Sequence, residues 1–319
     1  MRPVVWFVVG ATASGKSAVA ARLARRLAGT VVNADSRQVY RGMVVGAAAP
    51  GLEEQELAPH VGYHWHDPCA VVSLGEWLAH TAGLLREVLD AGRTPVVVGG
   101  SGQYVTALVQ GWTPPAVPPD PAMRAELEER ARRDGRDVLW RELRERDPDA
   151  AARIDPRNVR RLVRALEVIA STGLPFSEQR RRVEPWFAPI VLGIDVPRSE
   201  LYRRIDARAA AMFAGGLLEE ARTLRALDPP QGAPPRAAIG YREALDYLEG
   251  RCGLEDAIRR ACLATHRLAR VQDNWFRRHG LPVRWVAGSG DPDAVAEVAL
   301  RLGRDAAADR LAGRIAGPA

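Results

Sequence analysis

The sequence predicts an α/β fold in which helices flank a parallel β-sheet and a separate all-helical domain is inserted into the chain. Three observations predict it. An N-terminal apolar run ends in a glycine-rich loop, later apolar runs alternate with amphipathic helical stretches, and a proline-rich segment precedes a stretch dense in charge. The chain has 319 residues, 47% of them hydrophobic, which is enough to bury a core without disulfides.

The first strand and helix are predicted to enclose a phosphate-binding loop. Residues 4–9 are a β-branched apolar run, and residues 17–28 carry apolar side chains at helical spacing. The residues between them match G-x-x-x-x-G-K-[ST] without a mismatch. They are Gly10, Ala11, Thr12, Ala13, Ser14, Gly15, Lys16 and Ser17. The fold is therefore expected to be P-loop NTPase-like.

Such a loop holds phosphate through its backbone and two side chains. The glycines allow successive N–H groups to point at the anion, and the following helix adds its positive end. Lys16 reaches the terminal phosphate, and the Ser17 hydroxyl binds Mg²⁺. The motif leaves open whether the anion is a triphosphate or a diphosphate.

Lys16 is also the only lysine among 45 basic residues, the other 44 being arginine. This composition indicates a bias that replaces lysine with arginine wherever either serves. Lysine is a compact point charge on a flexible stem, whereas arginine is a wide planar fork. We interpret Lys16 as a position where arginine fails.

A carboxylate follows the second predicted strand and none follows the third. Residues 30–36 end in Asp35 and Ser36, whereas residues 94–98 lead into Gly99-Gly100-Ser101, so the usual Walker-B carboxylate is missing. Ligands of open α/β sheets lie beyond the carboxyl ends of the strands. Asp35 is thus either a general base beside the phosphates or a turn cap. Ser101 either binds phosphate or caps a helix.

The proline-rich segment 112–121 marks a domain boundary. We expect a catalytic core at 1–115 and 189–319 and an all-helical insertion at 116–188. The insertion is predicted to hold helices at about 122–133, 138–146 and 157–172. The core resumes with a strand at 189–194. It continues with helices at about 198–213, 216–227, 240–249, 254–278 and 292–312 and an edge strand at 283–286.

Composition excludes several classes of protein. Cys69, Cys252 and Cys262 are widely spaced and form neither a disulfide framework nor a zinc pattern. No stretch approaches the roughly 18–20 apolar residues of a membrane span. We expect a cytoplasmic protein, and its net charge of +6 does not by itself indicate nucleic-acid binding.

The chain resembles the tRNA dimethylallyltransferase (tRNA isopentenyltransferase) family of bacterial type. Beyond the phosphate loop, the marks include Asp-Ser-Arg-Gln-Val-Tyr at 35–40 and Arg-Ala-Leu-Glu-Val at 164–168. The other matching runs are residues 98–104, 238–243 and 272–277. All occur in family order between residue 10 and about residue 278.

The resemblance implies transfer of a dimethylallyl group from dimethylallyl diphosphate to N6 of adenosine 37 beside the tRNA anticodon. The phosphate loop then holds the diphosphate, with Mg²⁺, and Asp35 is the general base. Ser101 and Arg208 are implied to act near the diphosphate, although Arg208 is otherwise read as a solvated helix residue. The partner is the anticodon stem-loop, and a monomer is expected. The implied tRNA contacts are Asp35, Ser36, Arg37, Gln38, Ser101, Asn158, Arg160 and Arg161.

Two departures and two alternatives remain. Ala47 and Ala49 stand where the family usually has threonine and lysine, and Leu268 to Gln272 offers fewer polar groups than the family pattern. The main alternative is a P-loop small-molecule kinase, in which Asp35 would deprotonate a hydroxyl. The second is a non-catalytic, RNA-binding GTPase-like module.

Overall fold

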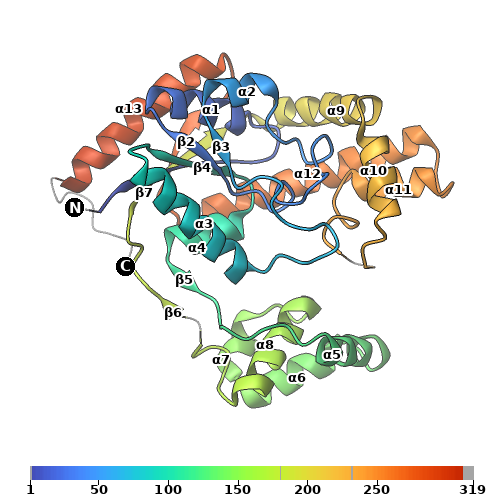
Figure 1. Ribbon diagram of the computed structural model, residues 1–319. Helices are drawn as coiled ribbons and strands as arrows, with labels where there is room; N and C mark the ends of the chain where they lie inside the picture. Colours follow the sequence, from blue (N-terminus) through green and yellow to red (C-terminus); the bar gives the residue numbers. More distant parts are fainter. Residues whose placement is uncertain (1, 180, 231–232, 312–319) are drawn as a thin grey trace. The chain divides into compact units, whose positions relative to one another are not determined.

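The computed structural model describes residues 2–179, 181–230 and 233–311, which divide into two compact units (Figure 1). The larger unit comprises Met1–Gln110 together with Pro185–Ala319, and the smaller comprises Gly111–Glu184. The sequence-based boundaries, at 115/116 and 188/189, lie a few residues further along the chain.

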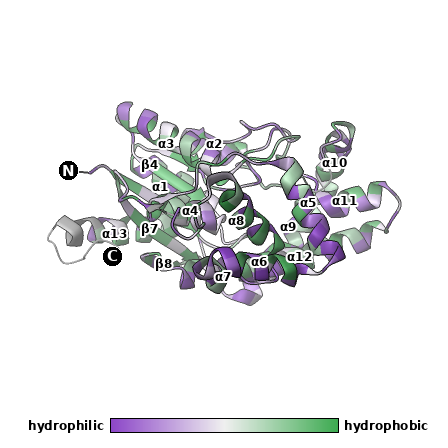
Figure 2. Cartoon of the chain, turned by 90° about the horizontal axis from the view of Figure 1, so that it is seen from below, coloured by the Kyte–Doolittle hydropathy of each residue, from purple (hydrophilic) through white to green (hydrophobic). Residues whose placement is uncertain are grey.

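A six-stranded parallel sheet organises the larger unit, with strand order β3-β2-β4-β1-β7-β8. In the central strands Phe7 pairs with Val97 on one side and Val191 on the other. The strands are β1 (Val4–Val9), β2 (Thr30–Asn33), β3 (His60–Val61), β4 (Pro95–Gly99), β7 (Ala188–Asp195) and β8 (Val283–Ala287). The apolar residues of the inner strands β2, β4, β1 and β7 are almost all buried, as expected of a parallel sheet, whereas those of the edge strands β3 and β8 are mostly half-buried. Figure 2 colours β4 and β7 as hydrophobic.

Helices cover both faces of this sheet. Trp6 and Val8 pack in one cluster with the helices α1 (Lys16–Arg26) and α13 (Pro292–Leu311). Phe7 and Val9 point the other way, because successive side chains of a strand alternate between faces. They share a cluster with α3 (Leu74–Asp90), α4 (Gly102–Val109) and α12 (Leu254–Arg278). The predicted sheet flanked by helices is thus confirmed.

Four further helices complete the larger unit. They are α2 (Leu52–Leu57), α9 (Arg198–Ala214), α10 (Leu217–Ala226) and α11 (Tyr241–Leu248). Helix α9 packs on α12, and α10 packs on α11. The sequence-based description contained neither α2 nor α3, and it extended the last helix to residue 312, which lies outside the described residues. No helix among the described residues is long and apolar enough to cross a membrane.

The smaller unit has a hydrophobic core of its own. Its helices are α5 (Pro121–Arg133), α6 (Arg136–Arg146), α7 (Pro148–Arg153) and α8 (Val159–Thr172). Leucines at 127, 139, 143, 162 and 166 are buried among them. A short antiparallel pair, β5 (Trp112–Thr113) with β6 (Arg181–Arg182), also belongs to this unit, which is therefore not purely helical.

A buried carboxylate ties α5 to α8. Glu167 has no exposed side-chain surface and accepts hydrogen bonds from Arg124 at 2.7 and 2.9 Å, from Arg164 at 2.6 Å and from the Asp120 amide at 2.8 Å. We expect Glu167→Gln to lower the free energy of unfolding by about 2 kcal/mol, because two guanidinium groups lose their counter-charge. Chemical denaturation measures this, with exposed Glu126→Gln as the control. Equal stabilities of the two variants would contradict the expectation.

Candidate active site

The phosphate loop joins β1 to α1 in a conformation that needs its glycines. Gly10 has φ 152°, and a Cβ there would lie 2.9 Å from the Ile194 carbonyl oxygen. Gly15 has φ 84° and immediately precedes α1. Ala13 also has a positive φ, of 64°. The loop thus has positive φ angles at three positions directly before the N-terminus of α1, the end of a helix that favours an anion.

One side chain of the loop has a buried polar atom without a hydrogen-bond partner in the described part of the chain. Ser14 is 2% exposed, and its Oγ has no hydrogen-bond partner among the described residues. A buried hydroxyl without a partner is costly, and a phosphate oxygen would satisfy it. The loop therefore shows both the backbone form and the free donor expected of a diphosphate site.

Lys16 is held at the start of α1 by the loop itself. Its Nζ donates to the Ala11 carbonyl oxygen at 3.4 Å. Burial lowers its pKa to about 8; the charge of Arg208 acts in the same direction, and that of Asp35 opposes both. The ammonium group is therefore poorly solvated and poised for an anionic ligand.

This pKa predicts a pH dependence for diphosphate binding. Bound diphosphate favours the protonated amine, so affinity is highest below pH 8 and falls as Lys16 loses its proton above it. Calorimetric titration with inorganic diphosphate from pH 6.5 to 9.5 measures this. Lys16→Met corrects for ionisation of the ligand. An affinity ratio of wild type to Lys16→Met that stays constant above pH 8 would contradict the assignment.

Asp35 lies directly beyond the carboxyl end of β2, and only one of its oxygens is occupied. Oδ1 accepts the Arg37 amide at 2.9 Å, and its own amide donates to Asn33 Oδ1 at 2.8 Å. Among the described residues no hydrogen bond involves Oδ2. Asp35 thus caps a turn through one oxygen, as one of the two interpretations expected, and its second oxygen makes no hydrogen bond among the described residues; its role as a general base stays a prediction.

Ser101 lies beside this turn at the end of β4. Its Oγ accepts the Ser36 amide at 2.9 Å and makes no capping bond to α4. The two strand ends approach closely because Gly99 has no side chain: a Cβ there would lie 2.1 Å from the Ala34 carbonyl oxygen. The structure therefore brings Asp35, Ser36 and Ser101 together.

Arg208 is a largely buried residue of α9, and not a solvated one. Its Nη2 donates to Thr12 Oγ1 at 2.6 Å, and burial lowers its pKa while the charge of Asp35 opposes the shift. A buried guanidinium with one hydrogen bond at the phosphate loop has donors left for a ligand. It lies at the phosphate loop, bonded to Thr12, and its role at a diphosphate stays a prediction.

Gln272 is a site residue whose role the sequence did not reveal. It is 8% exposed on α12, its Oε1 accepts the Thr12 amide at 2.8 Å, and its Nε2 donates to the Gly100 carbonyl at 3.0 Å. A single side chain thus links the phosphate loop to the segment that holds Ser101. The sequence carries one signal for this role: Gln272 begins residues 272–277, a run that resembles the family.

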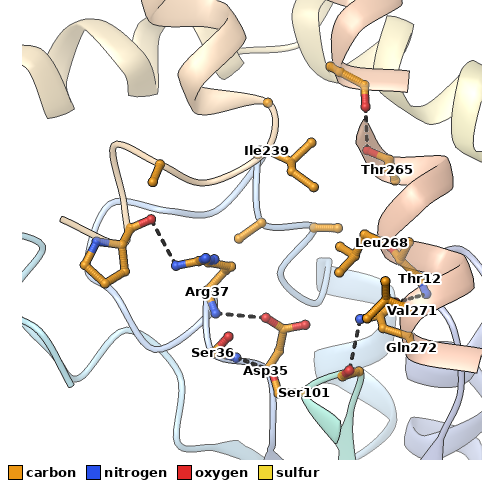
Figure 3. Close-up of a pocket in the computed structure, with 18 of the residues that line it drawn as sticks. Thr12, Asp35, Ser36, Arg37, Ser101, Ile239, Thr265, Leu268, Val271 and Gln272 are labelled. Atoms are coloured by element: carbon orange, nitrogen blue, oxygen red, sulfur yellow. Dashed lines mark hydrogen bonds between the residues drawn. The ribbon is translucent and has the colours of Figure 1, made fainter. Parts of the chain in front are cut away.

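One pocket of about 560 Å³ is lined by Thr12, Asp35, Ser101, Arg208 and Gln272 (Figure 3), whereas Ser14 lines a second pocket. Thr12 and Gln272 lie on one side of Asp35 and Arg37 on the other. The apolar part of the lining comes from α9 and α12 and includes Ile205, Met212 and Leu268. The pocket therefore combines one residue of the phosphate loop, a largely buried guanidinium, a carboxylate and an apolar wall.

The residues expected to contact RNA are placed differently from one another. Arg37 lines the pocket and donates to the Pro234 carbonyl at 2.9 Å. Gln38 is 8% exposed, and its amide donates to the carbonyls of Ala47 at 3.0 Å and Ala48 at 2.8 Å. Gln38 thus supports a loop of the protein itself.

In the smaller unit the predicted contacts surround the start of α8. Asn158 accepts the Arg161 amide at 3.2 Å through its side chain and so caps this helix. Arg160 and Arg161 are exposed, and neither has an ion-pair partner among the described residues. Two free cations at one helix end form a basic surface.

A metal ion at the phosphate loop would have few protein ligands. Ser17 is half-buried in the first turn of α1. Within the described part of the chain no group of three or more His, Cys, Asp or Glu side chains could hold a metal. A hydroxyl, diphosphate oxygens and water are a ligand set that suits Mg²⁺.

Known proteins resemble this chain over most of its length. The family model described as IPP transferase matches residues 38–279, and the one described as Isopentenyl transferase matches residues 3–59. A tRNA dimethylallyltransferase of Thermomicrobium roseum is 45% identical over 87% of this chain and 84% of its own. One of Anaeromyxobacter dehalogenans is 46% identical over 91% and 96%.

Solved structures agree with these matches. The tRNA isopentenylpyrophosphate transferase of Bacillus halodurans superimposes with a TM-score of 0.69, at 34% identity over 97% of this chain and 96% of that one. A eukaryotic dimethylallyltransferase acting on tRNA, at 23% identity and a TM-score of 0.80, supports the fold alone. By sequence match and by structure, the chain belongs to the IPP transferase family.

Proposed function

We propose that the protein transfers a dimethylallyl group from dimethylallyl diphosphate to N6 of adenosine 37 in tRNA. The observation that carries the proposal is a pocket lined by Thr12 of the phosphate loop, by Arg208, which bonds to Thr12, and by Asp35, whose carboxylate has one oxygen free of hydrogen bonds among the described residues. Membership of the IPP transferase family, with relatives named tRNA dimethylallyltransferase, supports it.

The residues divide the reaction between two sides of the pocket. The adenine amine attacks C1 of the donor, the C–N bond forms as the C–O bond to diphosphate breaks, and Asp35 takes the amine proton on Oδ2. The amine is a weak nucleophile because its lone pair is delocalised into the ring, so an adjacent base lowers the barrier. Negative charge accumulates on the leaving diphosphate.

Several groups of the protein would stabilise the negative charge on the leaving diphosphate. They are Lys16, Arg208 and the amides of the phosphate loop that make no bond to a described residue, whereas the Thr12 amide already donates to Gln272. Ser101 holds the Asp35 turn through the Ser36 amide. Ser17 would hold Mg²⁺, which when bound supplies further positive charge against the diphosphate.

The proposed contacts with tRNA come from residues of both units. Ser36 and Arg37 lie at the pocket, and Arg160 and Arg161 offer exposed charge for phosphates, with Asn158 fixing the end of their helix. We propose that the anticodon stem-loop binds these surfaces and that the target base leaves its stack to reach Asp35. A monomer acting in the cytoplasm is part of this proposal.

Transfer from defined donors tests the assignment. The purified protein is incubated with Mg²⁺, unmodified tRNA and either dimethylallyl diphosphate or ATP, and the tRNA nucleosides are analysed by mass. A prenylated adenosine formed only with the first donor is expected. Phosphate transfer from ATP without prenylation would instead indicate the small-molecule kinase, and nucleotide binding without either product would indicate the GTPase-like module.

A further inference from the structure

Two walls of the pocket come from segments far apart in the sequence. Gly46, Ala47 and Ala48 form one wall, and residues 234–240, which precede α11, form the other. The Arg37 side chain connects to the second wall through the Pro234 carbonyl. Arg37 lies on the side of Asp35 away from Thr12, so its contact with Pro234 lies on that side too (Figure 3).

A single carboxylate of α10 joins the first wall to Tyr241, the residue that directly follows the second wall. Glu220 Oε1 accepts the amides of Val44 at 3.2 Å and Val45 at 2.7 Å, and Oε2 accepts that of Gly46 at 3.1 Å. The Tyr241 hydroxyl donates to Oε2 at 2.6 Å. We call these residues the Glu220 cluster: Glu220, Tyr241 and the amides of residues 44–46.

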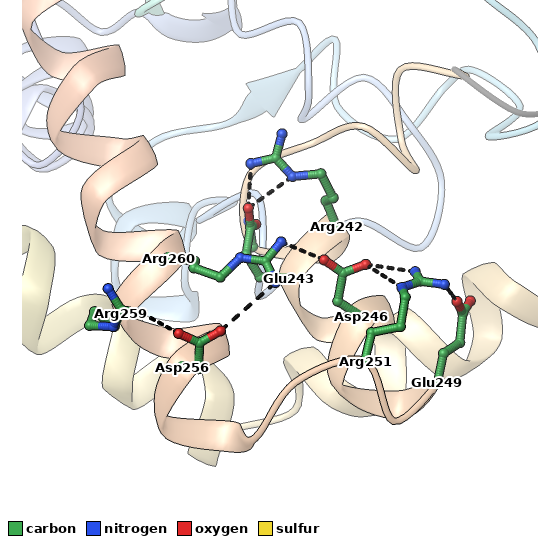
Figure 4. Close-up of polar contacts among 9 residues, drawn as sticks. Arg242, Glu243, Asp246, Glu249, Arg251, Asp256, Arg259 and Arg260 are labelled. Carbon is green, nitrogen blue, oxygen red and sulfur yellow. Dashed lines mark hydrogen bonds and ion pairs between the residues drawn. The ribbon is translucent and has the colours of Figure 1, made fainter.

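Tyr241 is held in place by its burial and by the other contacts of α11. It has no exposed surface, and its neighbour Glu243 accepts the Gly240 amide at 2.8 Å and pairs with Arg242. Asp246 on the same helix pairs with Arg251 at 2.6 Å and with Arg260 of α12 at 2.5 Å (Figure 4). Helix α11 is therefore held independently of Glu220.

Two backbone hydrogen bonds shape the loop: the Ala48 amide donates to the Val45 carbonyl at 3.0 Å, and the Ala49 amide donates to the Val44 carbonyl at 2.9 Å. The loop consists of small residues, with alanine at 47, 48 and 49, and Ala48 has φ 50°. A Cβ on Gly46 would lie 2.4 Å from the Tyr241 ring, so the backbone is pressed against it. The Gln38 side chain adds hydrogen bonds to the carbonyls of Ala47 and Ala48, and the Glu220 cluster supplies the contacts to α10 and α11.

We propose that Glu220 is a positioning residue that sets the acceptor wall of the pocket, a role that rests on the proposed function. Its carboxylate accepts four hydrogen bonds and so fixes the backbone of residues 44–48 against Tyr241. The acceptor nucleotide of the tRNA, beside Arg37 and Asp35, would thus contact a wall whose shape is already fixed. Other residues fix the diphosphate side of the pocket. Loss of Glu220 therefore impairs use of tRNA and spares the donor.

Steady-state kinetics of Glu220→Gln tests this selectivity. A glutamine presents an NH₂ group to backbone donors, so the loop shifts. We expect about a hundredfold loss of kcat/KM for tRNA, since displacement of about 1 Å has such an effect, and a donor KM within about twofold of wild type. Glu219→Gln is the matched control, because Glu219 is exposed and pairs only with Arg222. It retains wild-type values.

A second variant covers the case in which Glu220→Gln folds poorly. Tyr241→Phe removes one donor and keeps the ring, and we expect a smaller loss for tRNA alone. The two changes together are less than additive because both act on one cluster. Equal rises in both KM values, full additivity or unchanged kinetics for both variants would overturn the proposal.

Hydrogen exchange separates this inference from the proposed function. In Glu220→Gln we expect faster exchange at the amides of Val44, Val45 and Gly46, with β1 unchanged. Wild-type exchange rates at these amides would overturn the positioning role whether or not the protein prenylates tRNA. Absence of prenylation by the wild-type protein would instead overturn the proposed function.

Discussion

Replacement of Asp35 by asparagine is expected to lower kcat for dimethylallyl transfer by about a thousandfold, within the range of general-base contributions. Asparagine keeps an oxygen that can accept the Arg37 amide, now bonded to Asp35 Oδ1 at 2.9 Å, so the turn survives. What it loses is the ability to take a proton at the second oxygen. Single-turnover assays with saturating tRNA and donor measure the loss.

Asp67→Asn is the matched control for this change. Asp67 Oδ1 accepts the Cys69 amide at 2.8 Å, the same two-residue turn, but the side chain is exposed and outside the pocket. The control retains its activity. If Asp35→Asn turns over at the wild-type rate, the proton goes elsewhere and the assignment of the base is wrong. Weaker binding of tRNA, with an unchanged rate of chemistry, would indicate a purely structural turn.

The sequence predicted the diphosphate side of the site because its residues are contiguous. Strand, loop and helix follow one another within residues 4–26, and the glycine and lysine positions are set by local geometry. The fold class follows for the same reason, since periodicity is a local property. Strand order is not local, yet the parallel sheet was implied by strands alternating with helices.

The contacts made by Gln272 and Glu220 were beyond such reasoning. Gln272 bonds to a residue 260 positions away, and Glu220 bonds to amides some 175 positions away. Some glutamine and glutamate side chains of a helix form hydrogen bonds to the backbone of another segment, and others face solvent. The hydrophobic pattern of a helix does not distinguish the two. Likewise Gln38 was expected to face RNA, and its partners instead prove to be carbonyls of its own chain.

Helix α3 was missed although the sequence carries a signal for it. Ser73 accepts the Glu76 amide and Glu76 reaches back to the Ser73 amide, which is a capping box. Trp77, Leu85 and Val88 are its buried residues. The short strand β3 has no such mark, because two residues carry no measurable alternation.

Replacement of Lys16 by arginine is expected to lower kcat/KM for the donor by about a hundredfold or more, comparable to removal of one transition-state hydrogen-bond donor. Both side chains are cationic, so the loss arises from shape. Lys16 Nζ lies 3.4 Å from the Ala11 carbonyl and within the influence of Asp35 and Arg208. A planar guanidinium needs more room there and would bring a second fork beside that of Arg208.

Arg25→Lys, the reverse change at an exposed position of the same helix, is the control and leaves the donor kinetics unchanged. Calorimetry with inorganic diphosphate separates binding from chemistry, because the loop binds this ion through its amides even when Lys16 is altered. Diphosphate affinity and kcat/KM that both match wild type would show that arginine serves as well. The single lysine among 45 basic residues would then be an accident of composition. A loss in Lys16→Arg but not in Arg25→Lys would mean that the loop requires a point charge on a narrow side chain. That requirement would explain why lysine is kept at this position in a chain that otherwise uses arginine.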